Sequence, residues 1–280
     1  MLLAISVGCE STPEFTALDS GLMFRKIEDA KDTTRAKAGQ IMNVVMTHVL
    51  DGDSVLYESG DETGYYVNPQ TGLPPNLQEA FLQCGVGDSV QIKMSYAEYA
   101  SLTGMPMTEN DSTSEVVWNL KVREIEEESV VVERITSEQL SAEKEVISEY
   151  LVNNNLEAEE TEEGISIVTS REGNGDYPQQ GDVVQVNYTL RLLDGTVIDT
   201  SYEDVAQEND VFNPQRNYAP FEITVGGGGV IEGWQIGIPK IDKGGKATLF
   251  IPSIYGYGAR SGGPIPANSI LMFDVEVVDF

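Results

Sequence analysis

Short runs of alternating or β-branched apolar residues recur in the first part of the chain, between about residues 20 and 126. Turn-forming residues such as Asp51-Gly52-Asp53 separate the runs, which is typical of strands joined by tight connections. The expected strands are Ile41–Leu50, Ser54–Tyr57, Ser89–Met94 and Val116–Ile125. Residues 20–126 are therefore predicted to form a strand-rich unit.

A helix is predicted after this unit. Thr136, with Gln139 three positions later, is a helix-capping pattern, and the apolar residues that follow share one helical face. These residues are Leu140, Ile147, Tyr150 and Leu151. The helix is expected to end at the asparagines 153–155. The acidic run 157–163 lacks the glycine-punctuated spacing of a calcium loop, so residues 127–163 are predicted to be a helical connector.

The remaining residues, 164–280, again carry strand patterns. The expected strands are Val183–Leu193, Thr196–Thr200, Glu222–Val225, Lys246–Ile251 and Ile270–Val278. Only one stretch, about Ile231–Ile238, is expected to be a short helix. Mostly antiparallel strands around a single short helix define an α+β unit.

The two strand-rich units contain matching stretches in the same order. The matches are 37–40 with 179–182, Met46–Gly52 with Tyr188–Gly195 (one residue gapped), 85–88 with 242–245, and Ser114–Val122 with Ser269–Val277. A domain duplication explains all of them at once.

The composition and the net charge of the chain disfavour some classes of function. The chain has 280 residues, of which 40% are hydrophobic and 22% charged, as in ordinary globular proteins. Asp and Glu outnumber Lys and Arg by 46 to 17, so the formal net charge is −29. Such a chain repels phosphate backbones and anionic lipid headgroups. We therefore expect neither nucleic-acid binding nor electrostatic docking on membranes.

Metal and cofactor chemistry is not expected either. Cys9, Cys84 and the single His48 are too few for a zinc site, and one histidine leaves no Ser-His-Asp triad. The run Gly226–Gly229 lacks the glycine order of a dinucleotide-binding loop. Cys84 lies in an apolar stretch and is predicted to be a small buried core residue.

The first nine residues resemble the end of a bacterial lipoprotein signal, in which the cysteine becomes the lipidated first residue. An apolar run ends in a small residue before Cys9, and the polar residues 10–19 follow as a tether. A basic start is missing, and Ser6 replaces the usual leucine three positions before the cysteine. The resemblance implies a lipid anchor at Cys9 and a bacterial cell-envelope location, periplasmic or at the outer membrane. A frayed apolar terminus is the alternative.

Six fragments of residues 164–280, in order, resemble FKBP-type peptidyl-prolyl cis-trans isomerases. They are Asn187–Thr189, Asp194–Ser201, Val230–Trp234, Tyr255–Gly258, Ile265–Ser269 and Phe273–Glu276. Each fragment alone is weak, whereas six in order are highly specific. The resemblance implies a half-barrel antiparallel sheet wrapped on one short helix, with a proline pocket between them. With the duplication, the chain is expected to hold two FKBP-like units joined by the connector.

The resemblance also implies which residues act. The catalytic set would be Tyr188, Asp199, Trp234, Tyr257 and Phe273, and the substrate-binding set Ile198, Phe221, Val230, Ile231 and Ile265. Trp234 would be the pocket floor. The backbone N–H of Ile231 and the phenol of Tyr257 would bond carbonyl oxygens of the bound peptide.

Two regions depart from the family pattern. The stretch between Ser201 and Pro220 is longer than the usual loop, and its Arg216 is left unaligned with the basic residue that the family often has there. In the first unit, the places of Tyr188, Asp199 and Trp234 are expected to be taken by Met46, Leu56 and Leu77. The proline pocket is therefore predicted to be lost from the first unit, which would be a structural or client-binding domain; a second active site there is the alternative.

The resulting hypothesis is an enzyme that isomerises X-Pro bonds and assists the folding of exported proteins. It would bind prolines of partly unfolded polypeptides in an apolar pocket and stabilise the twisted amide without covalent chemistry or a cofactor. By resemblance, FK506-like macrolides are further expected ligands. A non-catalytic chaperone or peptide-binding module is the alternative, and a carbohydrate-binding protein rests only on the Trp and Tyr content.

Overall fold

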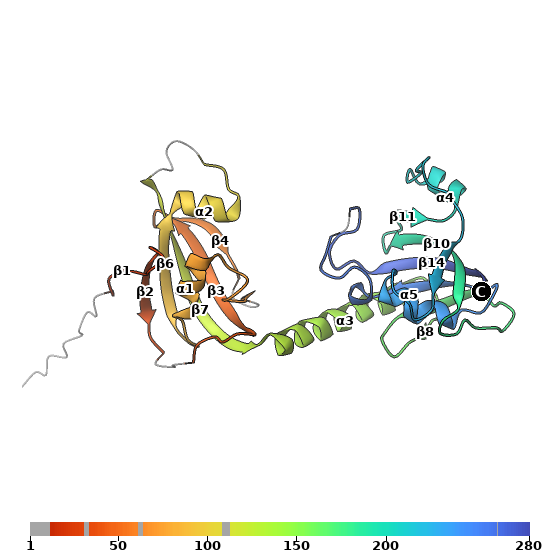
Figure 1. The fold of residues 1–280 in the computed structure, drawn as a ribbon, viewed down its shortest axis with the longest axis horizontal. Coiled ribbons are helices and arrows are strands. Elements are labelled where there is room, and N and C mark those ends of the chain that lie inside the picture. The colour runs from red at the N-terminus through yellow and green to blue at the C-terminus, as the bar shows by residue number, and fades with distance from the viewer. Residues whose placement is uncertain (1–11, 31–33, 61–63, 108–112, 262) are drawn as a thin grey trace, which may run out of the picture. The chain divides into compact units, whose positions relative to one another are not determined.

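The structure is a computed structural model that describes residues 12–30, 34–60, 64–107, 113–261 and 263–280. The chain divides into two compact units, with the boundary between Arg134 and Ile135 (Figure 1). Cys9, where a lipid anchor is predicted, lies outside the described residues. Among the described residues, no helix is long and apolar enough to cross a membrane.

The first unit is an antiparallel sheet with two short helices (Figure 1). Its strands are β1 (Thr16–Ala17), β2 (Met23–Glu28), β3 (Gln40–Leu50), β4 (Ser54–Glu58), β5 (Tyr65–Val67), β6 (Ser89–Ser95) and β7 (Glu115–Glu127). The strand order is β1-β2-β6-β7-β3-β4, and β5 pairs with β3. The helices are α1 (Pro75–Leu82) and α2 (Tyr96–Thr103). The core contains Cys84, as predicted, and burial raises the pKa of its thiol to about 12.

The second unit has the same construction. Its strands are β8 (Glu159–Glu160), β9 (Ser166–Arg171), β10 (Val183–Leu192), β11 (Val197–Thr200), β12 (Phe221–Thr224), β13 (Lys246–Ile251) and β14 (Leu271–Asp279). The order is β11-β10-β14-β13-β9-β8, and β12 pairs with β10. Its helices are α4 (Glu203–Glu208), α5 (Glu232–Gly237) and the 3₁₀ turns η2 (Ile238–Lys240) and η3 (Ser253–Tyr255).

Strand order and register confirm the predicted duplication. Read from the opposite edge, the first sheet has the order of the second, and β5 branches from β3 as β12 branches from β10. Met46 of β3 faces Leu120 and Tyr188 of β10 faces Val275, which puts Met46 in the place of Tyr188. Two residues further along the same strands, His48 pairs with Trp118, and Leu190 pairs with Phe273. Each unit is therefore the predicted α+β half-barrel.

Two glycines bring helix α5 close to the second sheet. A Cβ atom on Gly233 would lie 2.4 Å from Cγ2 of Ile251, and one on Gly237 would lie 2.8 Å from Cδ1 of Leu249. Larger side chains would therefore push the helix away from the strands. At this short distance Trp234, between the two glycines, is buried against the inner face of the sheet.

The helix α3 (Glu128–Asn153) ends at Asn153 as predicted but begins eight residues before Thr136. Its first turns are rich in β-branched residues, which have low helix propensity, so the sequence pattern missed them. Tertiary contacts override that propensity: Val131 is buried and the Arg134 guanidinium bonds the Glu126 carboxylate at 2.7 Å.

Short elements were also missed by the sequence pattern. Strands β2, β5 and β9 and helices α1, α2 and α4 were not predicted, because two to four apolar positions do not define a period. The single short helix expected in the second unit is therefore wrong, since α4 lies there as well as α5. Strand β1 lies within the predicted tether and pairs with β2.

Candidate active site

The second unit contains a cavity of about 450 Å³ between the inner face of its sheet and helix α5. Residues from four strands, from α5 and its preceding loop, and from the loop after η3 line this cavity. They are Tyr188, Leu190, Asp199, Phe221, Gly229, Val230, Ile231, Trp234, Tyr257 and Phe273. The cavity is thus an apolar, aromatic-walled site with one carboxylate on its wall.

Aromatic rings form the floor and walls of the cavity. The Trp234 ring centroid lies 5.2 Å from that of Tyr188, 5.1 Å from that of Phe273 and 6.0 Å from that of Phe221. The interplanar angles are 76–77°, the edge-to-face geometry that aromatic pairs prefer. The indole N–H of Trp234 is buried and has no hydrogen-bond partner within the described part of the chain.

The structure brings most of the expected site residues together. Only Ile198 and Ile265, of the ten, do not line the cavity. Ile198 lies at an irregularity in the pairing of β10 with β11, where the partner shifts from Asp199 to Val197, and it packs half-buried against the core of the unit. Ile265 is buried in the same core. Contact of these two residues with substrate stays a prediction.

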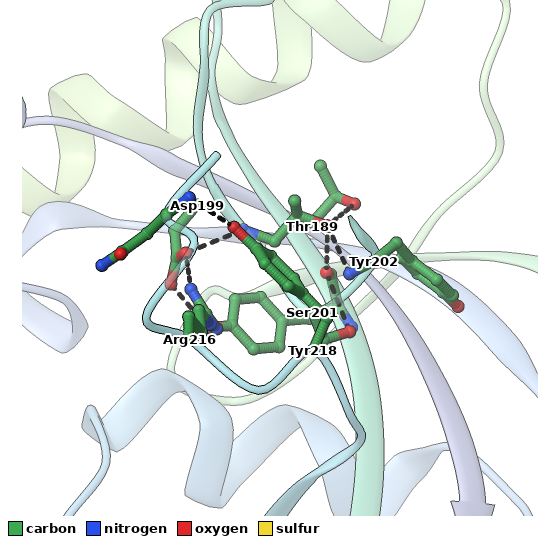
Figure 2. A network of polar contacts seen from close by, with 9 residues as sticks. Thr189, Asp199, Ser201, Tyr202, Arg216 and Tyr218 are labelled. Carbon is green, nitrogen blue, oxygen red and sulfur yellow. Dashed lines mark hydrogen bonds and ion pairs between the residues drawn. The ribbon is translucent and has the colours of Figure 1, made fainter. Parts of the chain in front are cut away.

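A polar network forms one wall of the cavity (Figure 2). The Tyr188 phenol donates a hydrogen bond of 2.5 Å to Oδ2 of Asp199, and the Arg216 guanidinium forms an ion pair with Oδ1. Arg216 Nη2 also donates to the Tyr188 oxygen at 2.8 Å. Burial, together with the neighbouring Asp199 carboxylate, raises the pKa of Tyr188 to about 12. The phenol therefore stays protonated at neutral pH and holds the carboxylate in place.

Arg216 comes from the long segment after β11, which the sequence could not align. Within that segment the rings of Phe212 and Tyr218 stack at 5.6 Å, and the Arg216 guanidinium lies 5.4 Å from the Tyr218 ring centroid. These contacts fold the segment back so that Arg216 reaches Asp199 (Figure 2). No local pattern could have shown this, because the contact spans a loop. Leu190 was missed too, although its spacing of two from Tyr188 on a strand is a usable signal.

The loop that carries Tyr257 is held by helix α3. Oε2 of the buried Glu143 accepts the Ser253 backbone N–H at 2.7 Å. The Ser253 carbonyl in turn accepts N–H groups of Gly256 at 2.9 Å and Gly258 at 2.8 Å, the residues on either side of Tyr257. Glu143 therefore positions a wall of the cavity from a distance of 110 residues in sequence.

We expect Glu143→Ala to leave the Ser253 N–H buried and unpaired, which lowers the free energy of unfolding of the second unit by about 1–3 kcal/mol. A looser Tyr257 should lower kcat/KM for a short X-Pro peptide by about tenfold, mainly through KM, since a 1 Å misplacement costs up to about 100-fold. Urea titration and a cis-to-trans relaxation assay measure the two effects.

The matched control is Glu145→Ala, which removes an exposed carboxylate from the same helix and should change neither quantity. Glu143→Gln keeps an acceptor oxygen and should restore KM. If Glu143→Ala and Glu145→Ala gave the same KM, Glu143 would not position the loop.

The first unit has a smaller cavity, of about 230 Å³, at the corresponding place. A cavity therefore remains in the first unit, although the polar wall is gone; the predicted loss of proline binding there stays a prediction. Tyr57 pairs with His48 as Asp199 pairs with Leu190, so Tyr57, and not the predicted Leu56, takes the place of the carboxylate. Met46 takes the place of Tyr188 as expected.

The fold and the cavity define a class of protein with an α+β half-barrel and an apolar, aromatic site beside hydrogen-bonding groups. A family model described as FKBP-type peptidyl-prolyl cis-trans isomerase matches residues 175–278. The chain is 42% identical over 117 residues to FK506-binding protein 1A of Aspergillus fumigatus, which covers 41% of this chain and 93% of the relative. It is 41% identical over 108 residues to a peptidyl-prolyl cis-trans isomerase of Schizosaccharomyces pombe, covering 38% and 85%.

A solved structure, FkpA from Escherichia coli, is 30% identical with a TM-score of 0.40, and the match covers 55% of this chain and 64% of that one. On the sequence matches, the chain belongs to the FKBP-type peptidyl-prolyl cis-trans isomerases. The reaction is rotation about an X-Pro amide, which amide resonance opposes with a barrier of about 18–20 kcal/mol. No bond breaks in this rotation, so an apolar cavity without an activated nucleophile suits it.

Proposed function

We propose that the second unit binds the proline of partly unfolded exported polypeptides in the 450 Å³ cavity and stabilises the twisted X-Pro amide there. The observation that carries this proposal is that the residues at the floor of the cavity are buried, whereas residues at its mouth are exposed. Trp234 and Phe273 are buried, whereas Phe221 and Tyr257 are 43% and 44% exposed. A prolyl ring can enter between the exposed residues while the rest of the polypeptide stays in solvent.

The cavity lowers the barrier through differential binding. Rotation removes resonance and makes the amide less polar, so an apolar surrounding disfavours the planar form relative to the twisted one. Donors near the rim, the Tyr257 phenol and the Ile231 backbone N–H, would hold the flanking carbonyl groups in the turned geometry. A millionfold acceleration needs a barrier reduction of about 8 kcal/mol, which several such contributions can supply together.

Macrolides of the FK506 type are proposed ligands of the same cavity. Relatives of the chain are named for binding FK506. The cavity volume of about 450 Å³ falls within the range of about 300–1,000 Å³ that is usual for drug-sized ligands. A macrolide in this cavity would compete with peptide substrates.

The proposal includes a lipid anchor at Cys9 and a location in the bacterial cell envelope. Support comes from the apolar run that ends in Gly8-Cys9 and from the polar residues after it. The other cysteine, Cys84, is buried and cannot accept a lipid without unfolding. An anchored isomerase would meet exported chains as they emerge, before their X-Pro bonds reach equilibrium.

The test compares the wild-type chain with Cys9→Ser, both expressed in a bacterium. We expect the wild type in the membrane fraction, labelled by radioactive fatty acid, and Cys9→Ser in the soluble fraction without label. Both should accelerate cis-to-trans relaxation of a short X-Pro peptide equally, and a macrolide of the FK506 type should inhibit both. Equal partitioning of the two proteins would contradict the anchor, and a relaxation rate equal to the uncatalysed one would leave only a peptide-binding module.

A further inference from the structure

The 230 Å³ cavity of the first unit is a shaped site with a buried floor and an open mouth. Tyr57 and Tyr65 at its mouth are 36% and 47% exposed, whereas Trp118, Tyr99 and Phe81 are buried. Tyr65 pairs with Val44 as Phe221 pairs with Val186, so Tyr65 takes the place of the exposed aromatic wall of the active site. The opening of the cavity therefore lies where the proline enters the second unit.

The inside of this cavity is aromatic and uncharged. The His48 ring stacks on Trp118 with 3.9 Å between centroids and an interplanar angle of 17°. His48 Nδ1 is within hydrogen-bonding distance of the Tyr99 hydroxyl, at 3.2 Å. Burial lowers the pKa of His48 to about 4, so the imidazole is neutral at neutral pH. Asp, Glu, Lys and Arg side chains are absent from the described wall, so uncharged groups are the compatible ligands.

Trp118 also has an unused donor. Its indole N–H is buried and finds no hydrogen-bond acceptor among the described residues, as is the case for Trp234 in the active site. A buried unpaired donor is unfavourable, and a carbonyl oxygen of a bound polypeptide would relieve it. The ligand that satisfies both features is an apolar ring next to a peptide carbonyl.

We propose that the cavity of the first unit is a second polypeptide site, which binds the ring of a proline residue in an extended chain without isomerising it. Aromatic-lined grooves recognise proline in extended segments, whose conformational entropy is already low. The volume of about 230 Å³ lies below the range for drug-sized ligands, about 300 Å³ and above, and fits a single side chain. Tyr57 replaces the carboxylate of the active-site wall, so the polar network that accompanies catalysis is absent from this described wall.

This inference does not depend on activity of the second unit, and the chain supplies separate probes for it. His48 is the one histidine of the sequence, so its ring protons give unique NMR signals from the first unit. Trp118 and Trp234 are the two tryptophans, so Trp234→Phe leaves Trp118 as the single tryptophan, whose emission is excited selectively at the red edge of the absorption band. An uncharged peptide of alternating alanine and proline is titrated, in parallel with its alanine–leucine counterpart.

We expect the alanine–proline peptide to shift the His48 signals and the Trp118 emission in a saturable way, and the alanine–leucine peptide to leave both unchanged. Thr103→Phe, at an exposed lining position, should weaken binding by about tenfold or more, equivalent to about 1.4 kcal/mol. Leu102→Phe, next to it and outside the lining, is the matched control and should bind as before. Tyr65→Ser, which removes one exposed wall, should also weaken binding.

Three results would overturn the proposal. One is the absence of any shift at saturating peptide. Another is an equal response to the alanine–leucine peptide, which would make the cavity a general apolar site. The third is unchanged affinity in both Thr103→Phe and Tyr65→Ser. Loss of isomerase activity with an intact His48 response would contradict the proposed function of the second unit only, so the two failures are distinguishable.

Discussion

Trp234→Ala is expected to lower kcat/KM for a short X-Pro peptide by about 100-fold or more, equivalent to about 2.7 kcal/mol of lost transition-state stabilisation. The indole is the buried floor on which Tyr188 and Phe273 pack edge to face at 5.2 and 5.1 Å. An alanine opens the floor to water, and water stabilises the polar planar amide that the cavity otherwise disfavours. The measurement is the relaxation rate of a cis-enriched peptide at several protein concentrations.

A matched variant and an internal probe separate loss of function from unfolding. Trp234→Phe keeps an aromatic floor and should retain activity within about tenfold, because most of the apolar contact area remains. In either variant Trp118 is the remaining tryptophan, so its emission reports the first unit alone. A buried Trp→Ala change costs about 3–5 kcal/mol of stability, so the second unit is checked by the circular dichroism and urea midpoint. A folded Trp234→Ala protein with wild-type turnover would remove the cavity from the mechanism.

The long strands and most of the site could be predicted because their signals are local. Strands β3, β7, β10 and β14 each carry enough alternating positions to fix a period of two. Most of the expected site residues stand in short motifs at strand ends and turns, and the resemblance fixed their order.

The residues that were missed act through the tertiary fold. Arg216 reaches Asp199 only because the rings in its own loop stack, and Glu143 reaches Ser253 only because α3 packs on the second unit. Ile147 of that helix is buried with Phe250 of β13. In neither contact are the two residues separated by a number of positions that a pattern in the sequence could reveal. The early start of α3 has the same cause, since packing there overrides the low helix propensity of valines.

The duplication explains how one scaffold holds two different sites. The strand order is the same in the two units, but the residues that face the two cavities differ. In the second unit, Leu190 pairs with Asp199 across two neighbouring strands. At the same two positions of the first unit, His48 pairs with Tyr57. Such exchanges replace a polar wall by an aromatic one. The scaffold therefore limits where a ligand binds, and the facing side chains decide what happens to it.

His48, which stands where the second unit has Leu190, predicts that the stability of the first unit changes between about pH 6.5 and 4. His48 is 6% exposed, and burial lowers its pKa from 6.5 to about 4 in the folded state. Between these values the unfolded chain binds a proton that the folded unit does not, so the free energy of unfolding falls as the pH decreases. The expected slope approaches 1.4 kcal/mol per pH unit, and the total loss between pH 6.5 and 4 is about 3 kcal/mol.

The measurement is urea unfolding of Trp234→Phe between pH 7.5 and 4.5, followed by Trp118 emission. His48→Leu, which introduces the residue of the second unit, should flatten the profile in this range. Asp88 is a separate contributor: burial opposes its ionisation, but hydrogen bonds from Lys26, Gly85 and Ala30 hold its pKa below the ordinary value. Its contribution is therefore lost only as the pH falls below about 4. An unchanged slope in His48→Leu between pH 6.5 and 4.5 would show that the imidazole is not the group that destabilises the first unit as the pH falls.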